Sequence, residues 1–431
     1  MSTLAEPSIA YRRYVLAVMA VISALNMADR QVVSILIEPI KREFGVSDTE
    51  MGMLTGLAFA LFHAVACVPI ALWADRSVRR TIVAAGLGVW SALTVVTGLT
   101  TSFASMFAIR IGVGVGEGTG GPPAHSLVSD YFPPERRAGA LAVLIVGAPI
   151  GSMIAYGAGG WVNEWYGWRA VFFLFGGIGV VVAPLVYFTI REPVRGRSDV
   201  GSPVVEAPPF REGIRILLGL SSFRHVVIAS ALNSTANYTF LIWAAPFLMR
   251  VHDMGTGAAG TYLALGFSVT NIFGVMLGGG VTDALGRRDQ RWLLWTPAFA
   301  SAIVAPFAWG FLFFNDLRWA IPCLAVAGLL NTIYIAPVYA AGQNVSTPGV
   351  RALASALVTL ANTVLGLGIG PVLVGWMNDY GAERYGETAI RYSLALMLLG
   401  HIGAAIHLAL ASKTYVANTS LNNPEEDVGP A

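Results

Sequence analysis

The sequence is short of charge and of cysteine. Only 12% of its 431 residues are Lys, Arg, Asp or Glu, whereas soluble domains carry about 25%. The two cysteines, Cys67 and Cys323, both lie in apolar runs, so they support neither a disulfide framework nor a zinc site. The net charge of +2 gives no reason to expect a nucleic-acid partner.

Motifs for nucleotide binding and catalysis are also missing. The sequence has no G-x-x-x-x-G-K-[ST] loop, so we do not expect ATP to drive this protein directly. Residues 116–121 (GEGTGG) match G-x-G-x-x-G, but they lie in an apolar stretch that no strand precedes, which argues against a dinucleotide site. The sequence shows no nucleophile elbow and no cluster of metal ligands. We therefore expect no enzyme activity, no metal and no cofactor.

The sequence is rich in long runs of apolar residues. It is 55% hydrophobic with a mean hydropathy of +0.64, which predicts an integral membrane protein. Runs of about 20 apolar residues predict about twelve spanning helices. Their expected ranges are 14–39, 50–74, 80–101, 103–131, 138–162, 168–190, 223–250, 257–284, 291–314, 318–341, 351–378 and 388–412. The expected parts are a six-helix bundle over 1–190, a Pro- and Gly-rich linker over 191–222, a second bundle over 223–412 and a tail over 413–431.

Sidedness and internal repetition follow from the same pattern. Most lysines and arginines fall on the side of the N-terminus, which predicts that both termini are cytoplasmic.

Residues 75–80 (DRSVRR) after the second span resemble 283–288 (DALGRR) after the eighth, and 161–167 (WVNEWYG) resemble 376–381 (WMNDYG). Two repeats of six helices predict that substrate is handled between the halves, near the midplane of the membrane.

The fourth span carries two charges in an otherwise apolar stretch. Arg110 and Glu117 are seven residues apart, which is two helical turns, so they share one face of a helix. A charge at the centre of a membrane span costs about 2.5–3.5 kcal/mol, so both are expected to face protein or water. Gly112, Gly116 and Gly120 recur every fourth residue and allow a neighbouring helix to approach closely.

The first span supplies a second acid and base, Asp29 and Arg30. Burial favours a neutral carboxyl group, whereas a neighbouring guanidinium favours the carboxylate. A Glu117 that gains and loses Arg30 or Arg110 as its partner would bind and release a proton, and we interpret Glu117 as the proton carrier. Arginine stays charged, so it serves as counter-ion or anion anchor. The alternative is a static ion network that only fixes helix packing.

Both copies of the repeated loop resemble the signature loop of the major facilitator superfamily. The second copy lies in residues 279–288 (GGVTDALGRR), and the first has Ala71 and Val78 where glycines are usual. Residues 147–151 (GAPIG) and 370–371 (GP) are similar to the Gly-Pro elements of the superfamily. The resemblance implies an all-α membrane protein with two pseudo-symmetric six-helix bundles that works by alternating access.

By the same resemblance, charged residues at the cytoplasmic helix ends form a latch that stabilises the outward-facing state. The alternative is charge that only sets topology, which explains the arginines but not the aspartates. The implied gate residues are Asp75, Arg76, Arg79, Arg80, Asp130, Asp283, Arg287 and Arg288.

Within the superfamily, the chain resembles the spinster subgroup. The residues that carry this resemblance are Asn26-Met-Ala-Asp29-Arg30, the Arg110 and Glu117 helix, and 130–137 (DYFPPERR). The resemblance implies a lysophospholipid or sphingolipid-like substrate and, in some relatives, coupling to protons. A sister group of organic-anion symporters has similar first and fourth helices, so a small organic acid or sugar acid is the alternative cargo.

Polar and aromatic residues in the apolar spans are candidates for lining a cavity. The first half has the charges and the second half has Asn, Tyr and Trp, which suits an amphipathic substrate with one polar end. For each residue alone, an interhelical hydrogen bond is the simpler interpretation. The candidates are Asn26, Phe59, His63, His125, Asn233, Asn237, Tyr238, Trp243, Asn271, Asn331, Tyr334 and Asn362.

These observations predict a proton-coupled secondary transporter. The alternative from another class is a membrane sensor that transports nothing, but a sensor does not need two gates. We expect a monomer in a bacterial inner membrane, with membrane lipids, protons and a small amphipathic substrate as its partners.

Overall fold

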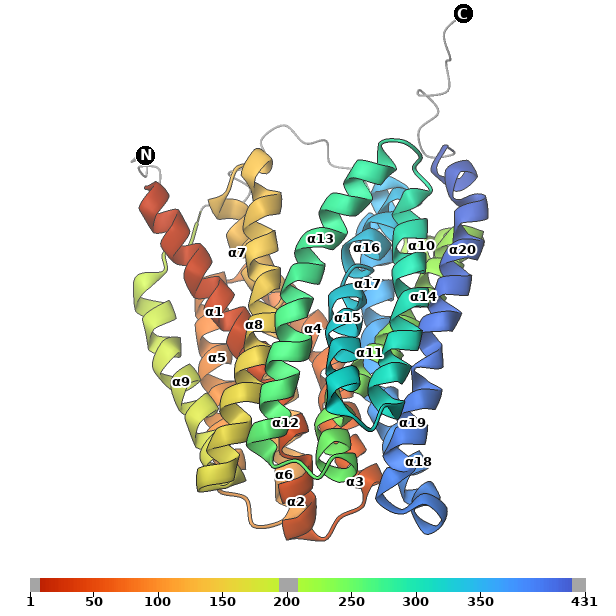
Figure 1. Cartoon of the computed structure of the whole chain (residues 1–431). Helices are drawn as coiled ribbons and strands as arrows, with labels where there is room; N and C mark the ends of the chain where they lie inside the picture. The colour runs from red at the N-terminus through yellow and green to blue at the C-terminus, as the bar shows by residue number, and fades with distance from the viewer. Residues whose placement is uncertain (1–7, 194–207, 421–431) are drawn as a thin grey trace, which may run out of the picture. The chain divides into compact units, whose positions relative to one another are not determined.

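The computed structural model describes residues 8–193 and 208–420, which are helical almost throughout (Figure 1). They fold into two compact units. The first comprises Met1–Ser47, Leu57–Ser202 and Met254–Ala264, and the second comprises Asp48–Gly56, Pro203–Asp253 and Leu265–Ala431. Each unit therefore includes one short segment from the opposite half of the sequence.

The helices of the first unit are α1 (Ile9–Ile35), α2 (Ile37–Phe44), α4 (Ala58–Arg76), α5 (Arg79–Thr97), α6 (Phe103–Glu117), α7 (Pro122–Tyr131), α8 (Pro134–Tyr166), α9 (Trp168–Thr189) and α12 (Thr256–Leu263). Those of the second unit are α3 (Asp48–Gly52), α10 (Phe210–Gly219), α11 (Ser221–Val251), α13 (Val269–Gly286), α14 (Trp292–Phe313), α15 (Leu317–Asn331), α16 (Ile335–Asn344), α17 (Arg351–Ala361), α18 (Gly370–Tyr385), α19 (Ala389–Met397) and α20 (Leu399–Ser420). Three π-helical segments, η1 (Met53–Leu57), η2 (Ala264–Ser268) and η4 (Asn362–Ile369), and two 3₁₀ turns, η3 (Pro348–Val350) and η5 (Gly386–Thr388), complete the described helices.

The described residues contain nine stretches long and apolar enough to cross a membrane, or ten if the bent pair α10 and α11 counts as one. About twelve were expected, and the difference has identifiable origins. The last of the nine stretches, Arg351–Thr419, is 69 residues long, whereas a single crossing needs about 20. The expected fourth span is split into α6 and α7, which have 15 and 10 residues. At the ends of the expected parts, α10 lies inside the expected linker and α20 continues past residue 412 to Ser420.

The split in the fourth span has a clear local cause. The helix α6 begins after Ser102, whose hydroxyl accepts the N–H of Ser105 as an N-cap. Residues 118–121 (GTGG) then interrupt the helix, because glycine loses the most backbone freedom in a helix. Pro122 starts α7, at a position where the missing N–H of proline costs nothing. Glu117 is therefore the last residue of α6, next to a break inside the membrane.

The repeated motif noted in the sequence fixes the two short segments that come from the opposite halves. In the first unit, Asn163 Nδ2 donates to Thr256 Oγ1 at 2.9 Å, and Gly257 N donates to Glu164 Oε2 at 2.7 Å. In the second unit, the equivalent residues bind the start of α3: Asn378 donates a hydrogen bond to it and Asp379 accepts hydrogen bonds from it. Asn378 Nδ2 lies 2.9 Å from Asp48 Oδ2, and the backbone N–H groups of Asp48 and Thr49 donate to Asp379 at 3.0 and 2.8 Å.

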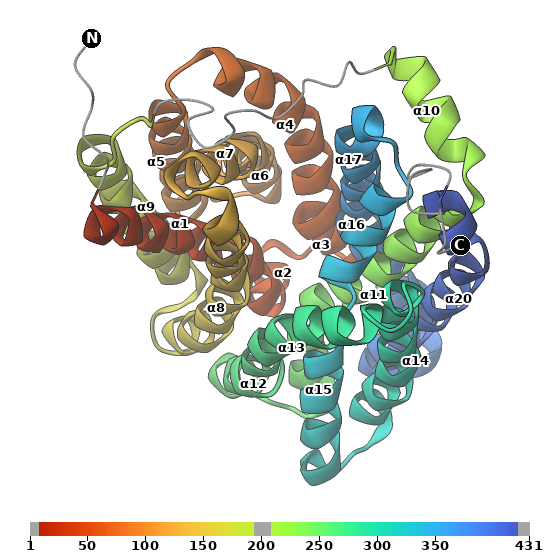
Figure 2. The same cartoon turned by 90° about the horizontal axis from the view of Figure 1, so that it is seen from above.

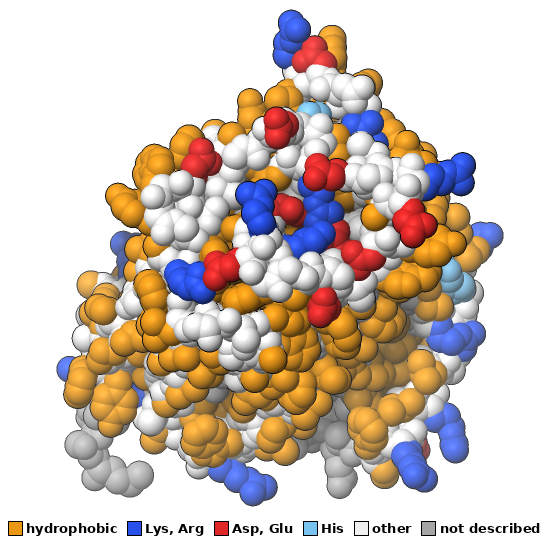
Figure 3. Space-filling view, turned by 90° about the horizontal axis from the view of Figure 1, so that it is seen from below, with side chains coloured by type: hydrophobic (Ala, Val, Ile, Leu, Met, Phe, Trp, Pro, Cys, Tyr) orange, Lys and Arg blue, Asp and Glu red, His pale blue; other side chains and the backbone are white. Residues whose placement is uncertain are grey.

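Close helix contacts organise the first unit. Figure 2 shows α5, α6 and α7 next to one another, with α9 against α5 and α8 against α1. A Cβ added at Gly116 would lie 2.9 Å from Trp90 Cβ, and one added at Gly112 would lie 3.0 Å from Leu93 Cδ1. The recurring glycines of α6 therefore allow α5 to approach. Figure 3 shows acidic and basic side chains on an end face with hydrophobic side chains around it, as expected where helices leave an apolar layer.

We predict that Gly176→Ala lowers the thermal unfolding temperature and that Gly177→Ala does not. A Cβ at Gly176 of α9 would lie 2.7 Å from Ser91 O and from Val95 N, which belong to the backbone of α5. A Cβ at Gly177 would meet nothing within 4 Å. Overpacking at Gly176 is expected to cost about 1–3 kcal/mol, measured by thermal unfolding in detergent. Equal shifts for both variants would contradict the α5–α9 contact.

Candidate functional site

Two helices of the first unit bring four ionisable side chains together inside the apolar layer. Asp29 and Arg30 lie on α1, and Arg110 and Glu117 lie on α6. The exposed fractions of these side chains are 5% for Asp29, 4% for Arg110 and 0% for Glu117, whereas Arg30 keeps 17%. The two acids and two bases balance in charge, and only one of the four is substantially open to solvent.

The first ion pair joins Arg30 and Glu117. Arg30 Nε donates to Glu117 Oε2 at 2.7 Å, and Asn26 Nδ2 donates to the same oxygen at 3.0 Å. Among the described residues, the other carboxylate oxygen, Oε1, has no hydrogen-bond partner although it is buried. One oxygen of Glu117 is thus fully engaged, and the other has an unused lone pair where a proton can bind.

The second ion pair joins Arg110 and Asp29. Arg110 Nη1 lies 3.9 Å from Asp29 Oδ2, and Arg110 Nη2 donates to the backbone carbonyl of Asp29 at 3.4 Å. The hydroxyl of Thr94 on α5 donates to the Asp29 carboxylate, and its Oγ1 lies 2.8 Å from each carboxylate oxygen. Asp29 therefore has a neutral donor as well as a counter-ion.

One aromatic ring lies beneath both guanidinium groups. The centroid of the Phe59 ring on α4 is 4.7 Å from Arg30 Cζ and 5.1 Å from Arg110 Cζ, which places both cations within cation–π range. His63 stacks on Phe59 at 5.2 Å and donates from Nδ1 to the Gly114 carbonyl at 3.2 Å. The close approach of α4 to α6 depends on Gly114, because a Cβ there would lie 2.9 Å from Phe59 O.

The energetics favour keeping the four groups together. Buried charges pay a desolvation penalty that mutual attraction only partly offsets, and removing one partner of a buried pair costs about 3–5 kcal/mol. Of the two candidate partners for Glu117, the structure pairs Arg30 with it and pairs Arg110 with Asp29. Thr94 was missed, since no spacing in the sequence links a threonine on α5 to an aspartate on α1.

The remaining cavity candidates divide into three groups. Asn26, Phe59 and His63 belong to the ion-pair cluster, whereas His125 on α7 is exposed. In the second unit, several candidates take part in interhelical hydrogen bonds: Asn233 to Ser301 at 3.0 Å, Asn331 to Asn237 at 2.6 Å, Ser230 to Asn362 at 2.8 Å and Trp243 to the Pro371 carbonyl at 3.0 Å. Asn271 and Tyr334 are buried, and Tyr238 is half-buried.

Two of the expected gate residues of the first unit, Arg79 and Asp130, form a second ion cluster with Glu192. Arg79 Nη1 lies 2.5 Å from Asp130 Oδ2 and Arg79 Nε lies 2.8 Å from Glu192 Oε1. The N–H of Arg80 also donates to Glu192, at 3.0 Å. The sequence reasoning missed Glu192, although it stands in the charged segment directly after α9. The side chain of Asp75 lies outside the described residues, and Arg76 is exposed.

The expected gate residues of the second unit are placed differently. Asp283, Arg287 and Arg288 are all exposed. Asp283 and Arg287 line a surface pocket of about 370 Å³ together with Thr282, Gln290 and Tyr415. Among the described residues, this loop shows no compact ion cluster like the one that Arg79, Asp130 and Glu192 form in the first unit.

Comparison with known proteins identifies the family. The model of the Major Facilitator Superfamily matches residues 19–371. The chain therefore belongs to this superfamily of membrane transporters. An MFS-type efflux pump of Mycolicibacterium smegmatis is 33% identical over 403 residues, which cover 92% of each chain. A D-galactonate transporter of Escherichia coli O6:H1 is 24% identical over 412 residues, 90% of this chain and 94% of that one.

Within the superfamily, a solved structure points to the spinster group. The crystal structure of a bacterial homologue of the human lysosomal transporter spinster, in an inward-facing and unoccupied conformation, is similar with a TM-score of 0.83. The identity is 28%, and the match covers 96% of this chain and 99% of that one. The all-helical transporter fold and the resemblance to spinster are thereby confirmed.

We predict that Arg30→Gln destabilises the protein more than Glu117→Gln does. Removing Arg30 leaves the fully buried Glu117 without its counter-ion, at a cost of about 3–5 kcal/mol. Removing Glu117 leaves an arginine that still has partial exposure and the face of Phe59. Thermal unfolding in detergent should show this order, and the loss for Arg30→Gln should shrink as pH falls, because protonation removes the uncompensated charge.

The double variant, Arg30→Gln with Glu117→Gln, provides the control for this pair. Because the two side chains form one ion pair, the combined loss should be smaller than the sum of the single losses. Additive losses would contradict the pairing of Arg30 with Glu117.

Proposed function

We propose that this transporter is a proton-coupled secondary transporter that works by alternating access, with Glu117 as the proton-binding group. The observation that supports this most is the position of Glu117: fully buried, paired with Arg30 through one oxygen and unpartnered at the other. A proton on Oε1 would neutralise the carboxyl group and weaken its attraction for Arg30. With a weaker attraction to Glu117, the Arg30 guanidinium would turn more readily toward an anionic group of the substrate.

Asp29 is proposed as the fixed counter-charge of this mechanism. Thr94 Oγ1 lies 2.8 Å from both of its oxygens and Arg110 Nη1 lies 3.9 Å from one of them, so its carboxylate has a hydroxyl donor and a counter-ion that are separate from those of Glu117. Protonation of Glu117 would therefore leave the pair of Asp29 and Arg110 in place. A ligand shifts a conformational equilibrium only by its different affinity for the two states, and the proton satisfies this condition if Arg30 leaves Glu117 in one state.

For the substrate, we propose an amphipathic anionic or zwitterionic lipid-like molecule of the lysophospholipid or sphingolipid class. Arg30 supplies the anion anchor, since it is the most exposed of the four charged groups. The similarity to a spinster homologue supports this class. A small organic acid or sugar acid is the second candidate, supported by the similarity to a D-galactonate transporter.

The cytoplasmic gate, the orientation in the membrane and the oligomeric state are also proposed. Arg79, Asp130 and Glu192 tie the end of α5 to α7 and to the segment after α9, and we propose that the repeated loops act together as the cytoplasmic latch. The excess of basic residues on the side of the termini supports cytoplasmic termini, and we propose a bacterial inner membrane as the location. We propose that a single copy of the chain is the working unit.

A binding screen separates the two substrate classes. The purified protein is heated in a non-ionic detergent with lysophosphatidylcholine, lysophosphatidylglycerol, sphingosine, galactonate or muconate. A ligand at 100 times its dissociation constant stabilises the folded state by about 2.7 kcal/mol, so a binder should raise the unfolding temperature. We expect the lysolipids to raise it in the wild type and to raise it less in Arg30→Lys, which lacks the bidentate fork. Stabilisation by galactonate or muconate alone would overturn the lipid-like substrate.

Proton coupling is tested in liposomes with the ligand found by that screen. Glu117→Gln should fold and bind substrate but should lose accumulation driven by a pH gradient, while exchange at equal pH continues. The matched control is Glu43→Gln. Hydrogen bonds from Arg169 and Trp168 lower the pKa of Glu43, which therefore stays charged at neutral pH and is not expected to carry a proton. Accumulation by Glu117→Gln at the wild-type level would refute the coupling role.

A further inference from the structure

Two helix breaks and one π-helical segment meet at an internal cavity of the second unit. The π-helical segment η2 contributes Phe267, the break between α15 and α16 contributes Asn331, and the break between α19 and α20 contributes Leu398. Inside a membrane, a helix can be interrupted only where other protein groups or water satisfy the freed backbone. Because two helix breaks and one π-helical segment meet at this cavity, its polar groups decide what can occupy it.

The cavity is small and lies in the interior of the unit. Its volume is about 10 Å³ of space open to a water-sized sphere, and all of its lining residues except Asn237 are buried. The lining residues are Asn237, Phe240, Phe267, Val304, Ala308, Ala327, Asn331, Leu398 and His401. About 10–15 Å³ of such space is needed to contain one water molecule, so the volume suits a single water and nothing larger.

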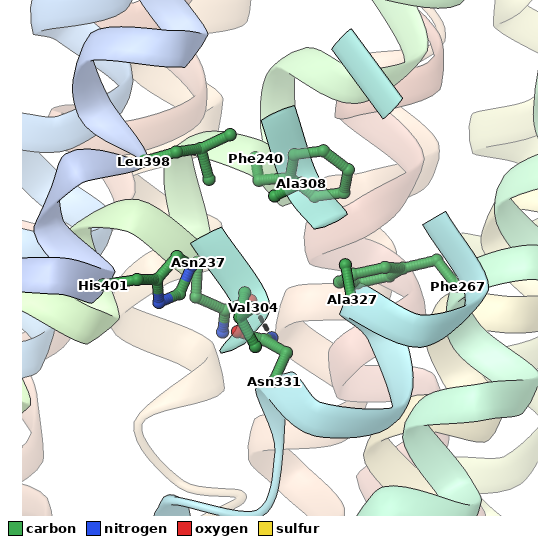
Figure 4. Close-up of a pocket in the computed structure, with 9 residues that line it drawn as sticks. All are labelled: Asn237, Phe240, Phe267, Val304, Ala308, Ala327, Asn331, Leu398 and His401. Atoms are coloured by element: carbon green, nitrogen blue, oxygen red, sulfur yellow. Dashed lines mark hydrogen bonds between the residues drawn. The ribbon is translucent and has the colours of Figure 1, made fainter. Parts of the chain in front are cut away.

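Polar side chains gather along one side of this cavity. Figure 4 shows His401, Asn237 and Asn331 next to one another, with Leu398, Phe240 and Phe267 around the rest. Asn331 Nδ2 donates to Asn237 Oδ1 at 2.6 Å. His401 Nδ1 and Asn331 Oδ1 have no hydrogen-bond partner among the described residues, although the two residues are only 2% and 5% exposed.

Two unsatisfied polar atoms on one cavity are costly. A buried donor or acceptor without a partner loses its hydrogen bonds to water, and such groups in native proteins are satisfied by other groups or by ordered water. A buried water needs a polar site with two to four partners, whereas a purely apolar cavity of similar size stays dry. His401 Nδ1 and Asn331 Oδ1 supply two partners, and the side-chain amide of Asn237 is positioned to supply a third.

We propose that this cavity is a binding site for one resident water molecule that bridges His401 and Asn331. The water donates one hydrogen to Asn331 Oδ1, and its second hydrogen bond joins His401 Nδ1 in the direction that the imidazole tautomer sets. It links the continuous helix α11 to the end of α15 and the start of α20 without placing a charge in the membrane. This site is independent of the ion-pair cluster in the first unit and of the proposed proton coupling.

An experimental structure of the full-length wild type tests the site directly. At a resolution that shows ordered water, we expect one density peak within about 3.2 Å of both His401 Nδ1 and Asn331 Oδ1. A cavity without density, or a direct hydrogen bond between the two side chains, would overturn the proposal.

Thermal unfolding of the full-length protein gives a second test. His401→Phe and Asn331→Leu should each lower the unfolding temperature, because each leaves the remaining partner and the water incompletely bonded. The double variant should lose less than the sum of the two. The matched control pairs His401→Phe with Asn362→Leu, an asparagine of the same unit that does not line the cavity, and this pair should be additive. Additive losses for His401 and Asn331 would overturn the bridge.

Discussion

The mutual neutralisation of two carboxylates and two guanidiniums inside an apolar layer is the constraint on which this transporter depends. None of the four charges is tolerable alone at that depth, yet together they balance. The arrangement is also unequal. The Thr94 hydroxyl lies 2.8 Å from both oxygens of Asp29, whereas Glu117 accepts from Arg30 and Asn26 through one oxygen and has no hydrogen-bond partner at the other among the described residues. A network that is satisfied on one side and incomplete on the other can change its protonation without coming apart.

Small residues in the surrounding helices allow the helices that carry these charges to pack closely. Gly114 and Gly116 admit α4 and α5 to the surface of α6, which places Phe59 under both guanidiniums and Thr94 beside Asp29. Glu117 stands at the last helical residue before the break at 118–121, where the backbone is no longer fixed by a continuous helix. The second unit has no such charges in its described interior cavity, and its polar link there is made by amides and one histidine.

Much of this architecture was predictable from the sequence, because it rests on periodicity and composition. Apolar runs predicted the spanning helices, and the spacing of Arg110 and Glu117 predicted their common face. The sequence could not predict which arginine pairs with which acid, since that depends on how α1 turns against α6. It also gave no sign of Thr94 or of the cavity at His401, because single polar residues on different helices meet only through tertiary packing. The sequence showed that the Trp161–x–Asn163 motif is repeated in the second half. It did not show that Asn163 and Asn378 bind the starts of helices that come from the opposite half of the sequence.

The central claim is that Glu117, and not Asp29, exchanges the proton. Infrared difference spectra of the purified protein between high and low pH detect buried carboxyl groups as they become protonated. We expect one protonated-carboxyl band of the wild type to be absent in Glu117→Gln and present in Asp29→Asn. Loss of that band in Asp29→Asn with its retention in Glu117→Gln would instead assign the proton to Asp29.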